Sequence, residues 1–323
     1  MFDIDKIKNQ NIIVIGDVML DAYIFGQVER ISPEAPVPVV MQRSLEFRLG
    51  GAANVALNIR AMGATPFLFG VIGDDDDAEK LRNELEGNGI SATSIVVESN
   101  RLTTVKTRII GNSHQLLRVD REVTHAITTA TENRLLENLE LKIGTAHALV
   151  FEDYEKGLLN ERFIQKIMIL CKEHNVPVIV DPKKNNFLAY SNATLFKPNL
   201  KEIKEGLKLN TLDSLGEIEA AAKTLIKTMN LKYVMVTLSD RGVMICDAEH
   251  TYHVPAHIRK IADVSGAGDT VVSIATLGLA QQIGPYSIAQ LSNLAGGLVC
   301  EEVGVVPLNK AHFVEEAQKL KLI

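Results

Sequence analysis

Tryptophan is absent from this sequence of 323 residues, and aromatic residues make up only 5% of it. The chain also lacks an excess of basic residues, because 34 lysines and arginines against 40 acidic residues give a net charge of −6. Nucleic acids select for clustered positive charge, and single strands also select for exposed aromatic side chains. We therefore expect neither a nucleic acid nor a membrane surface as a partner.

Cysteine is scarce, and its three copies, Cys171, Cys246 and Cys300, are scattered through apolar segments. An odd number of widely spaced cysteines indicates neither a disulfide framework nor a zinc motif. We interpret them as small core residues of a protein in a reducing cytoplasm.

Long hydrophobic runs are missing as well. Residues 1–11 are polar and charged, and the apolar run that follows covers only 12–15. Such a run is too short for a signal peptide or a membrane span, so we expect a cytoplasmic protein. Hydrophobic residues still make up 46% of the chain and charged residues 23%, which is typical of a globular protein with a substantial core.

Short apolar runs alternate with amphipathic stretches of helical length. We expect strands at 12–15, 65–69, 148–151, 178–180 and 233–238. We expect helices at 52–62, 78–88, 132–143, 161–174, 214–229, 268–282 and 286–303. This alternation predicts an α/β fold, in which helices flank a mainly parallel sheet and ligands collect at the carboxyl ends of the strands.

Two segments, 17–48 and 103–120, interrupt this rhythm. The first contains Pro33, Pro36 and Pro38, the second alternates as a strand does, and neither predicts a helix. We expect their strands to form a small β-sheet that acts as a lid over the active cleft and provides a dimer surface. The alternative is two surface excursions without a joint role.

The sequence Ala-Asp-Val-Ser-Gly-Ala-Gly-Asp-Thr at 262–270 comes directly before an apolar helical run. Glycines expose backbone N–H groups, and the first turn of a helix favours anionic oxygens. The amides of Gly266, Ala267 and Gly268 are therefore candidates for an anion hole, and Asp269 is a candidate general base. On this motif alone, an ordinary loop with an aspartate at a helix start is an equal alternative.

Three separated motifs together resemble the ribokinase-like sugar kinases, also called the phosphofructokinase B family. They are Gly-Gly-Ala-Ala-Asn-Val-Ala at 50–56, Lys-Pro-Asn-Leu-Lys-Glu at 197–202 and Asp-Val-Ser-Gly-Ala-Gly-Asp at 263–269. The resemblance implies an ATP-dependent carbohydrate kinase with a three-layer ribokinase-like fold and a small β-sheet lid. It also implies that 1–323 form one kinase domain.

Within this family the chain is similar to the heptose 7-phosphate kinases. The matching segments are 16–23 (Gly-Asp-Val-Met-Leu-Asp-Ala-Tyr), 30–39 (Arg-Ile-Ser-Pro-Glu-Ala-Pro-Val-Pro-Val), 115–120 (Gln-Leu-Leu-Arg-Val-Asp) and 153–157 (Asp-Tyr-Glu-Lys-Gly). The resemblance implies phosphorylation of D-glycero-β-D-manno-heptose 7-phosphate at C1 to the 1,7-bisphosphate, a step towards ADP-heptose for lipopolysaccharide. The alternatives are a kinase of another sugar and a catalytically silent binding protein that keeps the fold.

The resemblance also implies roles for individual residues. Asn199 and Glu202 are expected to hold Mg²⁺ through its waters, although the same spacing is typical of a helix cap. Residues expected to bind the sugar are Asp17, Asp21, Gly50, Gly51 and Asn54. Candidates for the clamp on its 7-phosphate are Lys106, Arg108, Arg118 and Lys156, of which we expect at least two to take part.

The ATP site implied by the resemblance is more dispersed. Its expected residues are Asn199, Glu202, Thr237, Ser239, Gly242, Gly266, Gly268 and Asn293. Asp263 is expected to help hold a monovalent cation such as K⁺, although a plain loop aspartate is a close alternative.

The chain departs from the family pattern at two positions. Ser265 stands where threonine is usual and keeps the hydroxyl, whereas Glu152 stands where a small polar residue is expected. The adenylyltransferase half of the fused bifunctional family members is also missing from the sequence, so we expect a separate polypeptide to supply that step.

Overall fold

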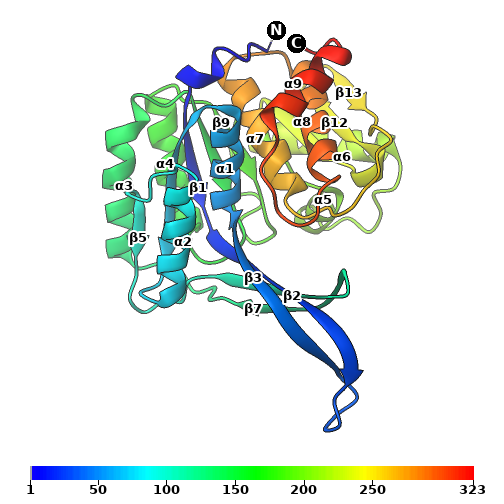
Figure 1. Ribbon diagram of the computed structural model, residues 1–323. Helices are drawn as coiled ribbons and strands as arrows, with labels where there is room; N and C mark the ends of the chain where they lie inside the picture. The colour runs from blue at the N-terminus through cyan, green and yellow to red at the C-terminus, as the bar shows by residue number, and fades with distance from the viewer. Residues whose placement is uncertain (1) are drawn as a thin grey trace.

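A nine-stranded sheet forms the centre of the computed structural model, which describes residues 2–323 (Figure 1). Its order is β13-β12-β11-β10-β9-β8-β1-β4-β5, and all neighbours run parallel except β11/β12 and β12/β13. The strands are β1 (Asn11–Gly16), β4 (Thr65–Ile72), β5 (Ile95–Val97), β8 (Ala148–Glu152), β9 (Val178–Asp181), β10 (Leu195–Phe196), β11 (Tyr233–Thr237), β12 (Val243–Cys246) and β13 (Thr251–Val254).

Helices cover both faces of this sheet. The helices are α1 (Ala52–Met62), α2 (Asp76–Gly87), α3 (Thr129–Ile143), α4 (Glu161–Glu173), α5 (Leu200–Gly206), α6 (Leu215–Met229), α7 (Ala267–Ala280), α8 (Pro285–Val299) and α9 (Lys310–Lys319). Successive strand residues point to opposite faces. Ile12 and Val14 therefore pack with α1, α7 and α8, whereas Ile13 and Ile15 pack with α3, α4 and α6. The result is the expected three-layer α/β fold.

The seven predicted helices are all present, with ends that differ by a few residues. The helix predicted to end at 303 ends at Val299, and the acidic pair Glu301 and Glu302 follows shortly after it. The start of α5 was expected only as the helix-cap alternative at Asn199 and Glu202. The prediction missed α9, the short strands β5 and β10, and the antiparallel pair β12 and β13. The strands among these are short, and periodicity is weak over few residues.

A second sheet is formed by the two segments that interrupt the main rhythm. Its order is β3-β2-β6-β7, with β2 (Val18–Ile31), β3 (Pro38–Gly51), β6 (Val105–Gly111) and β7 (His114–Arg121). The hairpin of β2 and β3 projects away from the body of the molecule, whereas the two termini lie together at the opposite end (Figure 1). The predicted small sheet is confirmed, and we call it the lid.

The three cysteines are buried and free, as expected for core residues. Within residues 2–323, none of the helices has the length and apolar character needed to cross a membrane.

Candidate active site

The carboxylate of Asp269 lies in the first turn of α7 and is 5% exposed. The side-chain amide of Asn54, on α1, donates a hydrogen bond of 2.8 Å to its Oδ2. The hydroxyl of Tyr154, in the loop after β8, donates one of 3.0 Å to its Oδ1. Burial raises the pKa of Asp269 to about 6, although these two hydrogen bonds oppose the rise. At neutral pH the carboxylate is therefore mostly ionised, oriented and able to accept a proton.

The backbone before Asp269 turns sharply into α7. Gly266 is the N-cap residue with φ of 78°, and a Cβ there would lie 3.0 Å from Nδ2 of Asn54. A side chain would therefore be strained by the backbone and crowded by the residue that orients the base. The N–H groups of Gly266 and Gly268 donate to no acceptor among residues 2–323, whereas the N–H of Ala267 donates to the carbonyl of Val264. Two of the three predicted anion-hole amides are thus free for a ligand.

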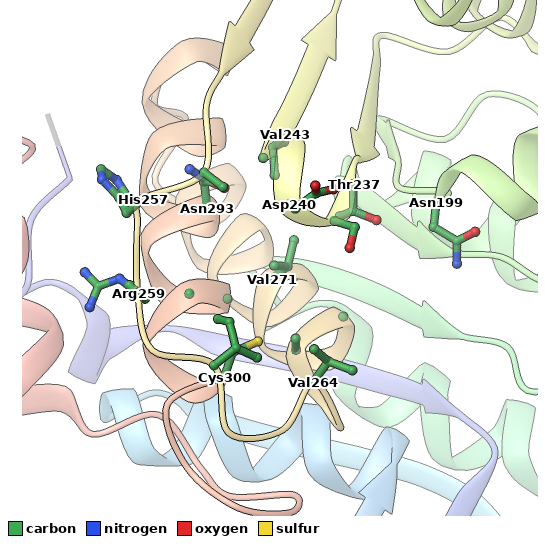
Figure 2. Close-up of a pocket in the computed structure, with 18 of the residues that line it drawn as sticks. Asn199, Thr237, Asp240, Val243, His257, Arg259, Val264, Val271, Asn293 and Cys300 are labelled. Carbon is green, nitrogen blue, oxygen red and sulfur yellow. The ribbon is translucent and has the colours of Figure 1, made fainter. Parts of the chain in front are cut away.

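A cavity of about 720 Å³ opens beside the start of α7 (Figure 2). Asn199 and Thr237 lie on one side of it and Asn293 and Cys300 on the other, with Val271 of α7 between them. The lining residues that were predicted to bind ATP are Asn199, Thr237, Ser239, Gly242, Gly268 and Asn293. Glu202 and Gly266, also predicted, are not among the lining residues but are next to them in the structure.

The loop between β13 and α7 contributes lining residues that the sequence reasoning missed. His257, Ile258, Arg259 and Ile261 come from this loop, which carries no periodic pattern or turn motif to identify it. Asn293 holds the loop through a 2.9 Å hydrogen bond to the carbonyl of Pro255.

Asn199 and Glu202 form a capping box at the start of α5. The Asn199 side chain accepts from the Glu202 N–H at 2.9 Å, and the Glu202 carboxylate accepts from the Asn199 N–H at 2.8 Å. The other Glu202 oxygen accepts from Lys183 Nζ at 2.6 Å. In this structure Asn199 and Glu202 therefore cap α5, as the alternative to the Mg²⁺ role predicted.

These side chains still offer hard oxygen atoms at the edge of the cavity, which suit a magnesium ion that keeps most of its waters. Among residues 2–323 there is no group of three or more His, Cys, Asp or Glu side chains that could hold a metal. A metal here would consequently depend on ligand phosphates and water for most of its coordination. The predicted Mg²⁺ role of Asn199 and Glu202 stays a prediction.

Asp17 lies between β1 and β2, and Asp21 lies on β2 of the lid. The N–H groups of Tyr154 and Lys156 donate to Asp17 Oδ2 at 2.8 and 3.0 Å, and burial raises the pKa of Asp17 to about 6. A Cβ on Gly50 would lie 2.3 Å from Asp21 Oδ2. Glycine thus permits the close approach of β3 to this aspartate.

The four predicted phosphate-clamp residues separate into two kinds. Lys106 and Lys156 converge on Glu122, with Nζ to oxygen distances of 3.3 and 2.9 Å. Arg108 instead pairs with Asp21, and Arg118 is half exposed and pairs with the neighbouring Asp120. The structure therefore brings two ammonium groups of the four together, around a carboxylate.

The carboxylate of Asp263 accepts hydrogen bonds from other groups of the protein. Its Oδ1 accepts from the N–H and hydroxyl of Ser265 at 3.0 and 2.9 Å, and its Oδ2 accepts from the N–H of Gly304 at 2.9 Å. Burial alone would raise the pKa of Asp263, but these hydrogen bonds lower it. The Ser265 hydroxyl supplies the contact that a threonine would also make, which explains why that departure is tolerated. Cation binding by Asp263 stays a prediction.

A row of buried charges beneath α7 was not assigned from the sequence. Lys197, at the end of β10, donates to Asp181 at 2.8 Å, and both side chains are almost fully buried. A Cβ on Gly268 would lie 3.9 Å from both Lys197 Nζ and Asp181 Oδ2, so this ion pair borders the anion hole. The only sequence signal for a role of Lys197 and Asp181 was that each comes at the end of an apolar run. The carboxyl ends of parallel strands lie at the edge of the sheet where ligands bind.

Residues 9–311 match the model of the pfkB family carbohydrate kinases. The chain belongs to this family. It is accordingly an ATP-dependent carbohydrate kinase, as the three motifs predicted. The catalytically silent alternative is not supported, because the base and the free glycine amides are in place.

Curated relatives are similar over almost all of the chain. Bifunctional protein HldE of Methylobacillus flagellatus is 39% identical over 95% of this chain and 63% of its own length. Bifunctional protein HldE of Helicobacter pylori is 36% identical over 91% of this chain and 64% of its own length. The chain thus spans less than two thirds of these relatives. The expected separate adenylyltransferase stays a prediction.

Solved structures confirm the fold. Phosphofructokinase-2 from Escherichia coli, in complex with substrates and products, superposes with a TM-score of 0.79 over 97% of this chain and 99% of its own, at 20% identity. Arabidopsis thaliana ribokinase, complexed with ribose and ATP, has a TM-score of 0.74 over 95% and 97% of the two chains, at 14% identity. The three-layer ribokinase-like fold with its lid is therefore established.

Proposed function

We propose that the chain transfers the γ-phosphoryl group of ATP to the C1 hydroxyl of D-glycero-β-D-manno-heptose 7-phosphate, giving the 1,7-bisphosphate for ADP-heptose synthesis in the cytoplasm. The observation that carries this proposal is the 35–39% identity to relatives named HldE, over 91% or more of the chain. The paired ammonium groups of Lys106 and Lys156 at the base of the lid support it. The phosphate that the sugar already carries at C7 would need such a pair of cations.

The residues at the start of α7 carry out the transfer. Asp269 takes the proton of the C1 hydroxyl while that oxygen forms a bond to the γ-phosphorus, and the bond to the β–γ bridging oxygen breaks to release ADP. The N–H groups of Gly266 and Gly268 stabilise the charge on the equatorial oxygens. Asn54 and Tyr154 hold the carboxylate in the orientation that the transfer requires.

Magnesium would be held by Asn199 and Glu202 through water and would supply charge neutralisation on the phosphates of ATP. Asp263 and neighbouring carbonyl groups would hold K⁺. Both assignments use oxygen donors at the border of the cavity or of the loop that leads into α7.

The 7-phosphate would bind between Lys106 and Lys156 and displace the Glu122 carboxylate that now lies between them. The Glu122 carboxylate and a phosphate are both anions that accept hydrogen bonds from ammonium groups, so a phosphate could replace this carboxylate between the two lysines. Asp17 and Asp21 would accept hydrogen bonds from the sugar hydroxyls.

The test is ATP consumption with Mg²⁺ across heptose 7-phosphate, fructose 6-phosphate, ribose, fructose and adenosine, with phosphorus NMR of any product. We expect turnover with the heptose and a new phosphate signal on C1. Turnover only with another sugar would overturn the heptose assignment and leave the family membership intact. The Asp269→Asn variant serves as the inactive control in every assay.

A further inference from the structure

Glu152 is a fully buried carboxyl group without a hydrogen-bond partner. It is the last residue of β8, its exposed fraction is 0%, and neither Oε1 nor Oε2 meets a donor among residues 2–323. Its position beside the active site is also where the family resemblance leads us to expect a small polar residue. A buried unpartnered carboxyl needs a physical explanation, because an isolated charge in a dry interior is strongly unfavourable.

The neighbouring strands define the surroundings of this side chain. Glu152 is in register with Gly16 of β1 on one side and Asp181 of β9 on the other. A Cβ on Gly16 would lie 2.1 Å from the carbonyl oxygen of Glu152 and 2.8 Å from its Cβ, so glycine permits the close approach of the two strands at this point. Because alternate strand residues share a face, Glu152 and Asp181 both face α7, as do Val150 and Ile179 two residues before them.

The neighbouring ionisable side chains are each bonded to a group other than Glu152. The ionisable groups whose fields act on Glu152 or feel its field are Asp181, Asp269, Lys183, Lys197, Tyr154 and Tyr190. Lys197 donates to Asp181 and Lys183 to Glu202. The hydroxyls of Tyr154 and Tyr190 donate to Asp269 and Asp153.

These pairings leave a simple charge balance. Lys197 neutralises Asp181, and Lys183 neutralises Glu202, whereas Asp269 has no cation of its own. An ionised Glu152 would add a further unbalanced negative charge next to the base and to the glycine amides. Burial raises the pKa of Glu152 well above its usual range, and the charges of Asp181 and Asp269 raise it further.

We propose that Glu152 is a positioning residue that keeps its proton throughout the reaction, so that no further negative charge is added beside Asp269 where the phosphoryl group is transferred. The proposal rests on the kinase reaction at Asp269 but not on which sugar is the acceptor. Its consequence is a defined alkaline limit. When Glu152 loses its proton, the added negative charge repels the phosphates of ATP that arrive at Gly268, and kcat/KM for ATP falls.

The experiment compares wild type with Glu152→Gln, which copies the neutral acid in shape. Between pH 5 and 10 we expect kcat/KM for ATP in the wild type to fall on the alkaline side by up to about tenfold per pH unit. In the variant this fall is absent, activity at pH 7 stays within about threefold of wild type, and the acid limb set by Asp269 near pH 6 is retained. A purely structural role for Glu152 would not move the alkaline limb alone.

The matched control is Glu132→Gln. Glu132 is equally buried, on α3, but its carboxylate accepts hydrogen bonds from Asn160 and Arg162 and lies outside the site. We expect this variant to keep the wild-type pH profile. An alkaline limb that survives unchanged in Glu152→Gln would overturn the proposal, as would a hundredfold loss at pH 7, because the latter would mean that the residue works as an anion.

A second measurement needs no sugar and therefore separates this inference from the proposed function. At pH 8 Asp17 and Asp269, whose pKa values are about 6, are almost fully ionised. The difference infrared spectrum, wild type minus Glu152→Gln, should then contain the carbonyl band of a protonated carboxylic acid. A difference spectrum without this band would contradict the proposal even if the acceptor sugar were still unknown. Its presence supports the proposal even if heptose 7-phosphate is not turned over.

Discussion

Asp269 is the proposed catalytic base, and its buried, ionised carboxylate lowers the free energy of unfolding. Raising its pKa from 3.8 to about 6 means that its ionised form destabilises the folded state by about 3 kcal/mol at neutral pH. We expect Asp269→Asn to lower kcat by about 10²–10⁴-fold, because the base is lost, and to raise the free energy of unfolding at pH 8 by about 1–3 kcal/mol. Steady-state kinetics and urea unfolding measure the two effects.

The pH dependence of this stability difference provides the control. A carboxyl group whose pKa is raised in the folded state contributes stability below its unfolded pKa and loses it as the pH rises through the folded value. For Asp269 the window is 3.8 to about 6. The advantage of Asp269→Asn should therefore shrink as the pH falls towards 4. An advantage that is constant over this range would show that ionisation of Asp269 is not its cause.

The lysine pair around Glu122 allows a test of substrate recognition. We expect Lys106→Met and Lys156→Met each to raise KM for the sugar phosphate by about 10–100-fold, because each removes a charge-assisted hydrogen bond to the phosphate. KM for ATP and kcat should change little. Arg118→Met is the matched control, because Arg118 is half exposed and pairs only with Asp120. Equal losses in all three variants would contradict a specific clamp.

At the residue scale, the sequence predicts most where one short segment contains the candidate residues. The Gly-Ala-Gly-Asp segment identified Asp269 as a candidate base and Gly268, which lines the cavity, as a candidate anion-hole residue. Tyr154, Lys197 and Glu152 could not be given roles in this way, because their partners lie across the sheet and no spacing along the chain records that proximity. The convergence of Lys106 and Lys156 also depends on Glu122, which no motif identified.

At the scale of elements, Gly51 joins strand β3 of the lid to α1. A substitution at this position tests whether the placement of β3 affects activity. Its φ is 56°, and a Cβ there would lie 2.4 Å from the Asp17 carbonyl, which is backbone and does not move aside cheaply. We expect Gly51→Ala to lower the melting temperature and to reduce kcat/KM for the sugar at least tenfold by displacing β3 from Asp17. Thermal unfolding and kinetics check this.

A second glycine supplies the comparison. Gly216→Ala lies on α6, where the added Cβ meets nothing within 4 Å, so stability should be unchanged or raised by up to about 1 kcal/mol. If both alanine variants behave alike, the close approach at Gly51 has no functional importance.

Elements that are long and amphipathic were predictable, and those that depend on their neighbours were not. The helix α1 has the predicted ends because its apolar face repeats with helical period and Gly63 ends it in a left-handed conformation. The strand β10 has two residues and forms only because β9 and β11 pair with it on either side. The lid strands were identified mainly because their segments lacked helical signals.

At the scale of the whole molecule, the lid carries exposed apolar side chains. They include Ile31, Val37, Met41, Leu117 and Val119, each about half exposed. Such a concentration on one projecting sheet is typical of an interaction surface, and we expect a homodimer formed through the lid. Sedimentation velocity at working concentration should show a dimer for the wild type and a monomer for the double variant Leu117→Lys, Val119→Lys. A monomeric wild type would end this prediction.

The hydrogen bond between Asn54 and Asp269 joins residues that are 215 positions apart in the chain. During synthesis, the amide that orients the base leaves the ribosome long before the base does, and α1 must wait for α7 with its packing face uncovered. The geometry for phosphoryl transfer therefore forms only when the last quarter of the chain docks, so an incomplete nascent chain has no means to consume ATP.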